Sequence, residues 1–185
     1  MVTTPLPPWP GTPPSWGGVL LREFTEADLP MVLDSATDPY IPLIGTLPAH
    51  ASVEEARAYV ARQRGRWDEG RGFSFAVAEA ATGRAVGGVG LWLGELRDGR
   101  AEIGYSVMPS ARGRGYATAA LIAGTAFAWT IPGLHRIELH IEPWNTASIR
   151  TAERAGYERE GLLRSHQEIG GRRRDMLLYA AIRPG

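Results

Sequence analysis

The sequence predicts a single α+β domain, in which about four helices cover a mixed, mostly antiparallel sheet of about seven strands. Strand-like runs at residues 73–77, 85–93 and 101–107 are separated by turn-forming pairs, as in an antiparallel meander. An apolar run at 117–129, flanked by strand-like runs at 101–107 and 137–141, predicts a central β-α-β unit with parallel strands. The length of 185 residues, with 44% hydrophobic and 22% charged residues, is typical of one globular domain.

The first seventeen residues are expected to form a proline-rich tail, with the domain occupying residues 18–185. Six prolines lie within the first sixteen positions, which favours a polyproline-like segment. This tail is predicted to be mobile unless Trp9 and Trp16 fasten it to the surface. It lacks the basic and apolar regions of a signal peptide, so a cytoplasmic location is expected.

Two capping signals predict the helices of the N-terminal half. After a first strand at 19–23, residues 25–28 read Thr-Glu-Ala-Asp and should begin a short helix that continues through residue 33. Residues 40–50 are predicted to be a loop. Ser52-Val53-Glu54-Glu55 is a clear capping box, and Gly70 suits the end of the helix that follows it. The next strand, through Phe73 and Phe75, alternates as if one of its faces were buried.

The C-terminal half alternates helices and strands. The helix at 117–129 is apolar nearly all round, so it should be buried against the sheet. Asn145 is placed to begin a further helix, which Gly156 should close. Two last strands, at 157–164 and 173–181, should be joined through Gly170-Gly171.

The stretch from Arg112 to Ala117 is the strongest functional signal in the chain. It reads Arg-Gly-Arg-Gly-Tyr-Ala and connects a strand to a helix. Glycines let the backbone approach an anion closely, and a helix N-terminus directs free N–H groups toward it. Arg112 and Arg114 add charge that can pair with phosphate oxygens. The residues therefore favour a phosphate-binding loop, with a basic surface turn as the alternative.

Three ordered motifs carry a resemblance to a known family. Arg112 to Ala117 matches R-x-x-G-x-A, and Asn145-x-x-Ser148 and Ala155-Gly156-Tyr157-x-x-x-Gly161 follow it. Together with residues 101–105 before the loop, they resemble the GNAT (GCN5-related N-acetyltransferase) superfamily, in its ribosomal-protein alanine acetyltransferase-like branch. The similarity spans roughly residues 20–183.

The resemblance implies an enzyme of the EC 2.3.1 class, an N-acetyltransferase. It would move an acetyl group from acetyl-CoA, its co-substrate, to a primary amine on a small molecule or a protein N-terminus, by direct transfer in a ternary complex. Two alternatives stay open: a non-catalytic CoA-binding sensor or partner-binding module, and an acyltransferase that uses another acyl-CoA. The residues that the resemblance assigns to the cofactor are Val107, Met108, Arg112, Gly113, Arg114, Gly115, Tyr116, Ala117 and Asn145.

Acetyl transfer to an amine needs a base, because an amine attacks only when it is neutral. Glu102 is the candidate base, since the resemblance places a glutamate that acts through water on this strand in some relatives. The alternative is a strand carboxylate that is solvated or paired with a neighbouring arginine. Ser148 is the candidate proton donor to the leaving thiolate, although it and Asn145 can also be explained by helix capping. Elsewhere in the superfamily a tyrosine is the acid, which makes Tyr105 or Tyr157 the second choice. At Tyr157 packing is the better interpretation.

The composition limits the classes of partner that the protein is expected to bind. The formal net charge is zero and no apolar run is long enough for a membrane span, so neither nucleic acid nor membrane is an expected partner. The chain has no cysteine, and its four histidines lack metal-ligand spacing, so no metal is expected. His140 alternates with apolar residues and is interpreted as a satisfied core histidine. Residues 172–174, all arginine, could attract an acidic acceptor or the 3′-phosphate of CoA, or form a solvated turn. Many relatives are dimers, so a homodimer is possible.

Overall fold

The computed structural model describes residues 6–185, so the first five residues of the expected tail lie outside it. Its centre is one eight-stranded sheet with the order β1-β2-β3-β4-β5-β6-β8-β7, in which only β5 and β6 are parallel. The predicted mixed sheet and β-α-β unit are confirmed. The strand beyond the expected seven is the two-residue β1. The strands are β1 (Ser15–Trp16), β2 (Val19–Arg22), β3 (Gly72–Glu79), β4 (Ala85–Trp92), β5 (Arg100–Val107), β6 (Arg136–Ile141), β7 (Glu158–Ile169) and β8 (Arg172–Ile182).

Residues 6–185 form five α-helices, one more than expected. They are α1 (Leu29–Ser35), α2 (Ile41–Ile44), α3 (Val53–Asp68), α4 (Tyr116–Ala128) and α5 (Thr146–Arg154), with 3₁₀ turns η1 (Glu26–Asp28), η2 (Leu96–Asp98) and η3 (Pro109–Ala111). The unexpected helix α2 lies within the predicted loop at 40–50. The Asp38 carboxylate accepts hydrogen bonds of 2.8 Å from the N–H groups of Tyr40 and Ile41 and so caps this single turn.

Both predicted capping signals are present at helix starts. The Ser52 N–H donates to Glu55 Oε2 at 2.8 Å, and the Glu55 N–H donates to Ser52 Oγ at 3.2 Å. The Thr25 N–H donates to Asp28 Oδ2 at 2.8 Å in the same way. These interactions join residues three apart, which explains why the sequence alone could locate them.

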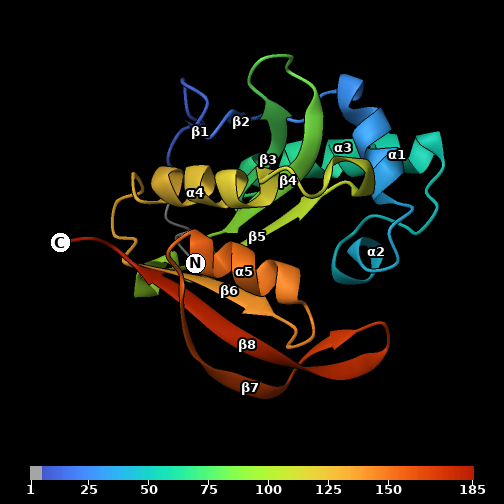
Figure 1. Ribbon diagram of the computed structural model, residues 1–185. Helices are drawn as coiled ribbons and strands as arrows, with labels where there is room; N and C mark the ends of the chain where they lie inside the picture. Colours follow the sequence, from blue (N-terminus) through green and yellow to red (C-terminus); the bar gives the residue numbers. More distant parts are fainter. Residues whose placement is uncertain (1–5) are drawn as a thin grey trace.

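Helices cover both faces of the sheet: Figure 1 shows α4 and α5 on one side of it and α3 on the other. The prediction that the strand at 73–77 has one buried face is therefore wrong, because β3 is buried on both. The rings of Phe73 and Phe75 meet Phe127 of α4 at centroid distances of 4.9 and 5.3 Å. On the opposite face, Ser74 Oγ donates to Gln63 of α3 at 2.8 Å.

The proline-rich segment lies against the domain over residues 6–16. The Trp9 ring packs on Phe75 at 4.8 Å, and Trp67 Nε1 of α3 donates to the Pro7 carbonyl at 3.0 Å. Trp16, by contrast, is 57% exposed. Trp9 thus fastens this segment, whereas Trp16 does not. Among the described residues, no helix combines the length and the apolar character needed to cross a bilayer.

The two parallel strands separate part of the way along. β5 and β6 pair only from Arg100↔Arg136 to Glu102↔Glu138, whereas β6 pairs with β8 along its whole length. Beyond Glu102, residues 103–107 of β5 pair with no strand of the described chain on that side. The sheet therefore opens between β5 and β6.

Candidate active site

Two cavities flank the opening between β5 and β6. The larger has a volume of about 570 Å³ and extends over the loop at 112–115 and the start of α4; we call it the donor cavity. The smaller, about 220 Å³, lies between α3, β4 and β6; we call it the acceptor cavity. The two share wall residues, so they meet at the opening. The shared residues are Tyr40, Ile41, Ile44, Tyr105, Ser106, Asn145 and Ser148.

The donor cavity is lined by the predicted phosphate-binding loop. Gly113 and Gly115 both have φ of +79°, a conformation that favours glycine, and Gly115 is the N-cap of α4. A Cβ at either position would meet no atom within 4 Å, so the space above the loop is open. Within residues 6–185, the six consecutive N–H groups of residues 113–118 donate to no acceptor. Unpaired N–H groups at a helix N-terminus are suited to bind an anion.

The Arg112 side chain already has partners within the chain, which the sequence did not predict. Its Nη2 lies 2.7 Å from Asp38 Oδ2, and its Nε donates to the Val107 carbonyl at 3.1 Å. The guanidinium therefore ties the loop to the turn before α2, and Arg112 still lines the donor cavity. Arg114 is exposed and has no partner in the described chain. Arg154, which the sequence reasoning missed, lines the donor cavity from the last turn of α5.

The backbone N–H groups of Val107 and Met108 differ in whether they are available to a cofactor. The Met108 N–H donates to the Val86 carbonyl of β4 at 2.9 Å, so it is not free to bind a cofactor. Successive N–H groups of a strand point to opposite edges, so the Val107 N–H is directed toward the opening beside β6. The Met108 N–H is therefore not available to bind the pantetheine arm of the cofactor. Val107, by contrast, lines the donor cavity.

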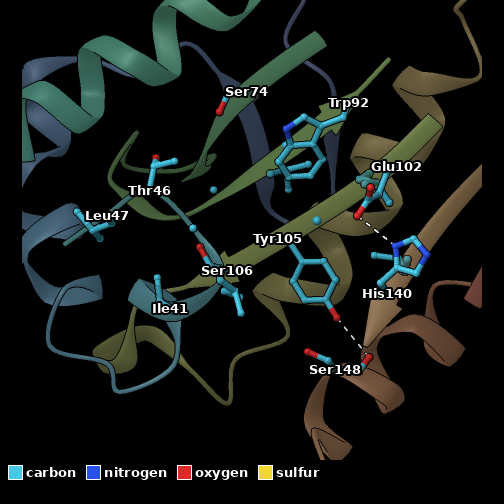
Figure 2. Close-up of a pocket in the computed structure, with 18 of the residues that line it drawn as sticks. Ile41, Thr46, Leu47, Ser74, Trp92, Glu102, Tyr105, Ser106, His140 and Ser148 are labelled. Atoms are coloured by element: carbon cyan, nitrogen blue, oxygen red, sulfur yellow. Dashed lines mark hydrogen bonds and ion pairs between the residues drawn. The ribbon is translucent and has the colours of Figure 1, made fainter. Parts of the chain in front are cut away.

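The candidate acid lies where the two cavities meet. Asn145 is the N-cap of α5 and accepts the Ser148 N–H at 3.1 Å, as capping predicted. The Tyr105 hydroxyl donates to the Ser148 carbonyl at 3.3 Å (Figure 2). Burial raises the pKa of Tyr105, and its interaction with the Ser148 side chain partly offsets that effect. Tyr157 lines neither cavity: its hydroxyl is 2.6 Å from Thr125 Oγ1, so it belongs to the packing.

The candidate base is paired with a histidine. Figure 2 shows Glu102 of β5 and His140 of β6 directed toward each other, with Oε1 and Nδ1 3.2 Å apart. Glu102 is 54% exposed and His140 only 13%. The Glu102 hydrogen bond raises the pKa of His140 above its ordinary value, against the opposing effect of burial. The sequence-based interpretation of His140 as a satisfied histidine did not identify its partner as Glu102.

Strand register is the signal that could have found this pair. Glu102 lies opposite Glu138 in the parallel ladder, and His140 lies two residues further along β6, on the same face. Because the β-α-β unit was predicted from the sequence, aligning its two strands would have placed His140 beside Glu102.

Trp92 explains the glycine in the middle of β5. A glycine in the middle of a strand often marks a bulge or a close backbone approach, but the β4–β5 register has no irregularity at Gly104. Instead, a Cβ at Gly104 would lie 3.1 Å from the Trp92 ring, and one at Gly90 would lie 2.7 Å from it. The indole thus occupies the space above the two glycines and forms part of the acceptor cavity.

The arginines at 172–174 lie away from the donor loop. Arg173 donates to the His166 carbonyl of β7 at 2.9 Å, and Arg174 Nε lies 3.6 Å from the buried Glu142 carboxylate. None of the three lines the donor cavity. The structure therefore does not support a role for them at the 3′-phosphate of CoA.

The fold and the site together define a class of protein, a transferase with separate donor and acceptor cavities that meet at an opening in the sheet. Residues 19–158 match the model of the acetyltransferase (GNAT) domain family. The chain is 27% identical over 163 residues to the uncharacterised N-acetyltransferase p20 of Bacillus licheniformis. The matched region covers 88% of this chain and 92% of that protein.

Solved structures agree with this match. Mycobacterium smegmatis RimJ in complex with CoA-disulfide has a TM-score of 0.75 at 32% identity, covering 89% of this chain and 81% of that one. A GNAT-family acetyltransferase from Bacillus anthracis has a TM-score of 0.76 at 24% identity, covering 93% and 99%. The chain belongs to the GNAT acetyltransferase family and is an acetyl-CoA-dependent N-acetyltransferase.

Proposed function

We propose that the protein transfers the acetyl group directly from acetyl-CoA to a primary amine while both are bound. The observation that carries this proposal is the meeting of the two cavities at the opening between β5 and β6. An acyl donor in one cavity and an amine in the other can react there without an acyl-enzyme intermediate. The amine nitrogen forms a bond to the thioester carbon, the C–S bond breaks, and CoA leaves as a thiolate that takes up a proton.

The donor cavity has groups suited to each part of CoA. The free N–H groups of residues 113–118 would bind the pyrophosphate, and Arg114 and Arg154 would add positive charge near the phosphates. The Val107 N–H, directed into the opening, would bind the pantetheine arm together with Asn145. An N–H at this point also stabilises the oxyanion that forms when the thioester carbonyl is attacked.

Glu102 is proposed as the base that takes the proton from the amine, directly or through one water. It lines the acceptor cavity at the opening. As a carboxylate, Glu102 accepts a hydrogen bond from Nδ1–H of His140 at 3.2 Å, which holds its side chain in place at the opening. Ser148, which lies in the wall shared by both cavities, is proposed to protonate the thiolate.

The test of this function is CoA release from acetyl-CoA in the presence of a panel of amines and peptides. Because the chain has no cysteine, a thiol reagent reports only the thiol of released CoA. We expect thiol release that depends on an amine, and an acetylated amine by mass spectrometry. A faster reaction with succinyl-CoA would identify a different acyl donor. Tight CoA binding without any release would identify a binding protein, and the proposal would be wrong.

Replacement of Glu102 by glutamine should separate two possible bases. If Glu102 takes the proton, the variant depends on amine that is already neutral, and its pH–rate profile moves up toward the pKa of the amine, about 8 for an α-amine. If His140 takes the proton, losing Glu102 lowers the pKa of His140, because their hydrogen bond is what raises it. The profile then moves to lower pH. We expect the upward shift.

The matched control for this variant is Glu138→Gln. Glu138 is the ladder partner of Glu102 but is bound to Arg136 at 2.5 Å and lines neither cavity. Glu138 also raises the pKa of His140, but less than Glu102 does, so its replacement should move the profile much less than Glu102→Gln. NMR titration of His140 should show a lower pKa in Glu102→Gln than in the wild type. A wild-type rate and profile in Glu102→Gln would remove Glu102 from catalysis.

A further inference from the structure

A buried amide in the wall of the acceptor cavity has an unpaired polar atom. Gln63 of α3 is 3% exposed. Its Oε1 accepts the Ser74 hydroxyl at 2.8 Å, but its Nε2 has no hydrogen-bond partner among the described residues. Rotating the amide by half a turn would exchange the two atoms and leave the other one unpaired. A buried polar atom without a partner is unfavourable in either orientation unless something else binds it, and Gln63 lines the cavity where a substrate would lie.

An arginine without an ion pair lies beside this amide. Arg66 is one turn further along α3, a spacing that brings two side chains together on one helix face, and it lines the same cavity. Its guanidinium lies over the Trp92 ring, 5.4 Å from the centroid. Glu69, at the C-terminal end of the helix and three residues from Arg66, is bound to Arg71 at 3.2 Å. No salt bridge among residues 6–185 joins Arg66 to a carboxylate.

The two ends of the acceptor cavity therefore present different polar groups to a substrate. Glu102 and His140 lie at the opening, where a carboxylate and an imidazole receive the amine. Arg66 and Gln63 lie on the α3 side, where a cation and an N–H donor face the same space. Trp92 lies between them, since it is the ladder partner of Glu102 and its ring also contacts Arg66.

We propose that the acceptor is a primary amine that also bears a carboxylate, which Arg66 and Gln63 Nε2 bind while the amine lies beside Glu102. This inference rests on the proposed function and specifies its acceptor. A guanidinium and an amide N–H are the groups that bind the two oxygens of a carboxylate. A polyamine has no group to pair with Arg66 and would be repelled by it.

The test compares acceptors that differ only in the carboxylate. One arm uses ω-amino acids of increasing length and their amides, and the other uses C-terminally amidated peptides beginning with Glu or with Gln. We expect the carboxylate member of at least one pair to have a kcat/KM higher by about tenfold or more. The arm in which the preference appears identifies the source of the carboxylate, a free amino acid or an acidic first residue.

Two variants test the residues independently. Arg66→Met and Gln63→Met should each remove most of the preference, chiefly through KM, while acetyl-CoA affinity by calorimetry stays unchanged. The matched control is Arg64→Met, on the same helix, because Arg64 is exposed, lies 3.9 Å from Glu23 and lines neither cavity. It should keep the preference.

The outcomes distinguish this inference from the proposed function. If no amine is acetylated, the proposed function itself fails. If amines are acetylated but acids and amides react equally, or if the preference survives in Arg66→Met, only the carboxylate inference is overturned.

Discussion

Replacing Gly115 with valine should weaken acetyl-CoA binding by about 100-fold or more, which corresponds to about 2.8 kcal/mol. Gly115 begins α4 and lines the donor cavity, and the space beside its Cα is open in the structure. A branched side chain would fill the space in which the pyrophosphate must approach the free N–H groups. Titration calorimetry with acetyl-CoA measures this effect.

Gly133→Val is the matched control for backbone strain. Gly133 has φ of +77°, also has open space beside its Cα, and lies away from both cavities. A left-handed valine costs about 1–2 kcal/mol of stability at either position, so both variants should unfold at lower denaturant concentrations. Only Gly115→Val should lose affinity. Unchanged affinity in a folded Gly115→Val protein would remove the loop from the cofactor site.

The second large effect is expected at Ser148. Ser148→Ala should lower kcat by about 100-fold, the loss typical of one general acid, and leave acetyl-CoA affinity nearly unchanged. Ser148 lies in the shared wall of the two cavities, so its hydroxyl is placed to reach the leaving sulfur. Steady-state kinetics and calorimetry on the same protein separate the two effects.

Tyr105→Phe is the competing variant. The Tyr105 hydroxyl lies in the same wall, and burial raises its pKa, which keeps its proton in place at neutral pH. If Ser148 is the acid, Tyr105→Phe should cost much less in kcat than Ser148→Ala. The reverse order of the two losses would assign the proton donor to Tyr105 and return Ser148 to the first turn of α5.

The sequence predicted those features that depend on residues close together in the chain. The capping box from Ser52 to Glu55, the N-cap at Asn145 and the glycine-rich start of α4 each involve a few consecutive positions. The β-α-β unit follows from the order of two strands and one helix, and its handedness and parallel pairing are general rules. These features were sufficient to predict the fold class and to place the donor loop.

The tertiary structure alone decided which groups were already occupied by other parts of the chain. Arg112 is bound to Asp38, and the Met108 N–H to Val86, although a pattern of consecutive residues offers both to the cofactor. The burial of β3 on both faces depended likewise on where α3 and α4 pack.

The acceptor side was the least predictable part of the site. It combines Gln63 and Arg66 of α3 with Trp92, Glu102 and His140 from three strands. The physical reason is that hydrogen bonds and ion pairs form between whichever groups the fold brings within about 3 Å, whatever their separation in the chain. The sequence by itself determined the fold and the donor loop, and the packing of distant elements determined which polar groups remained free to bind a substrate.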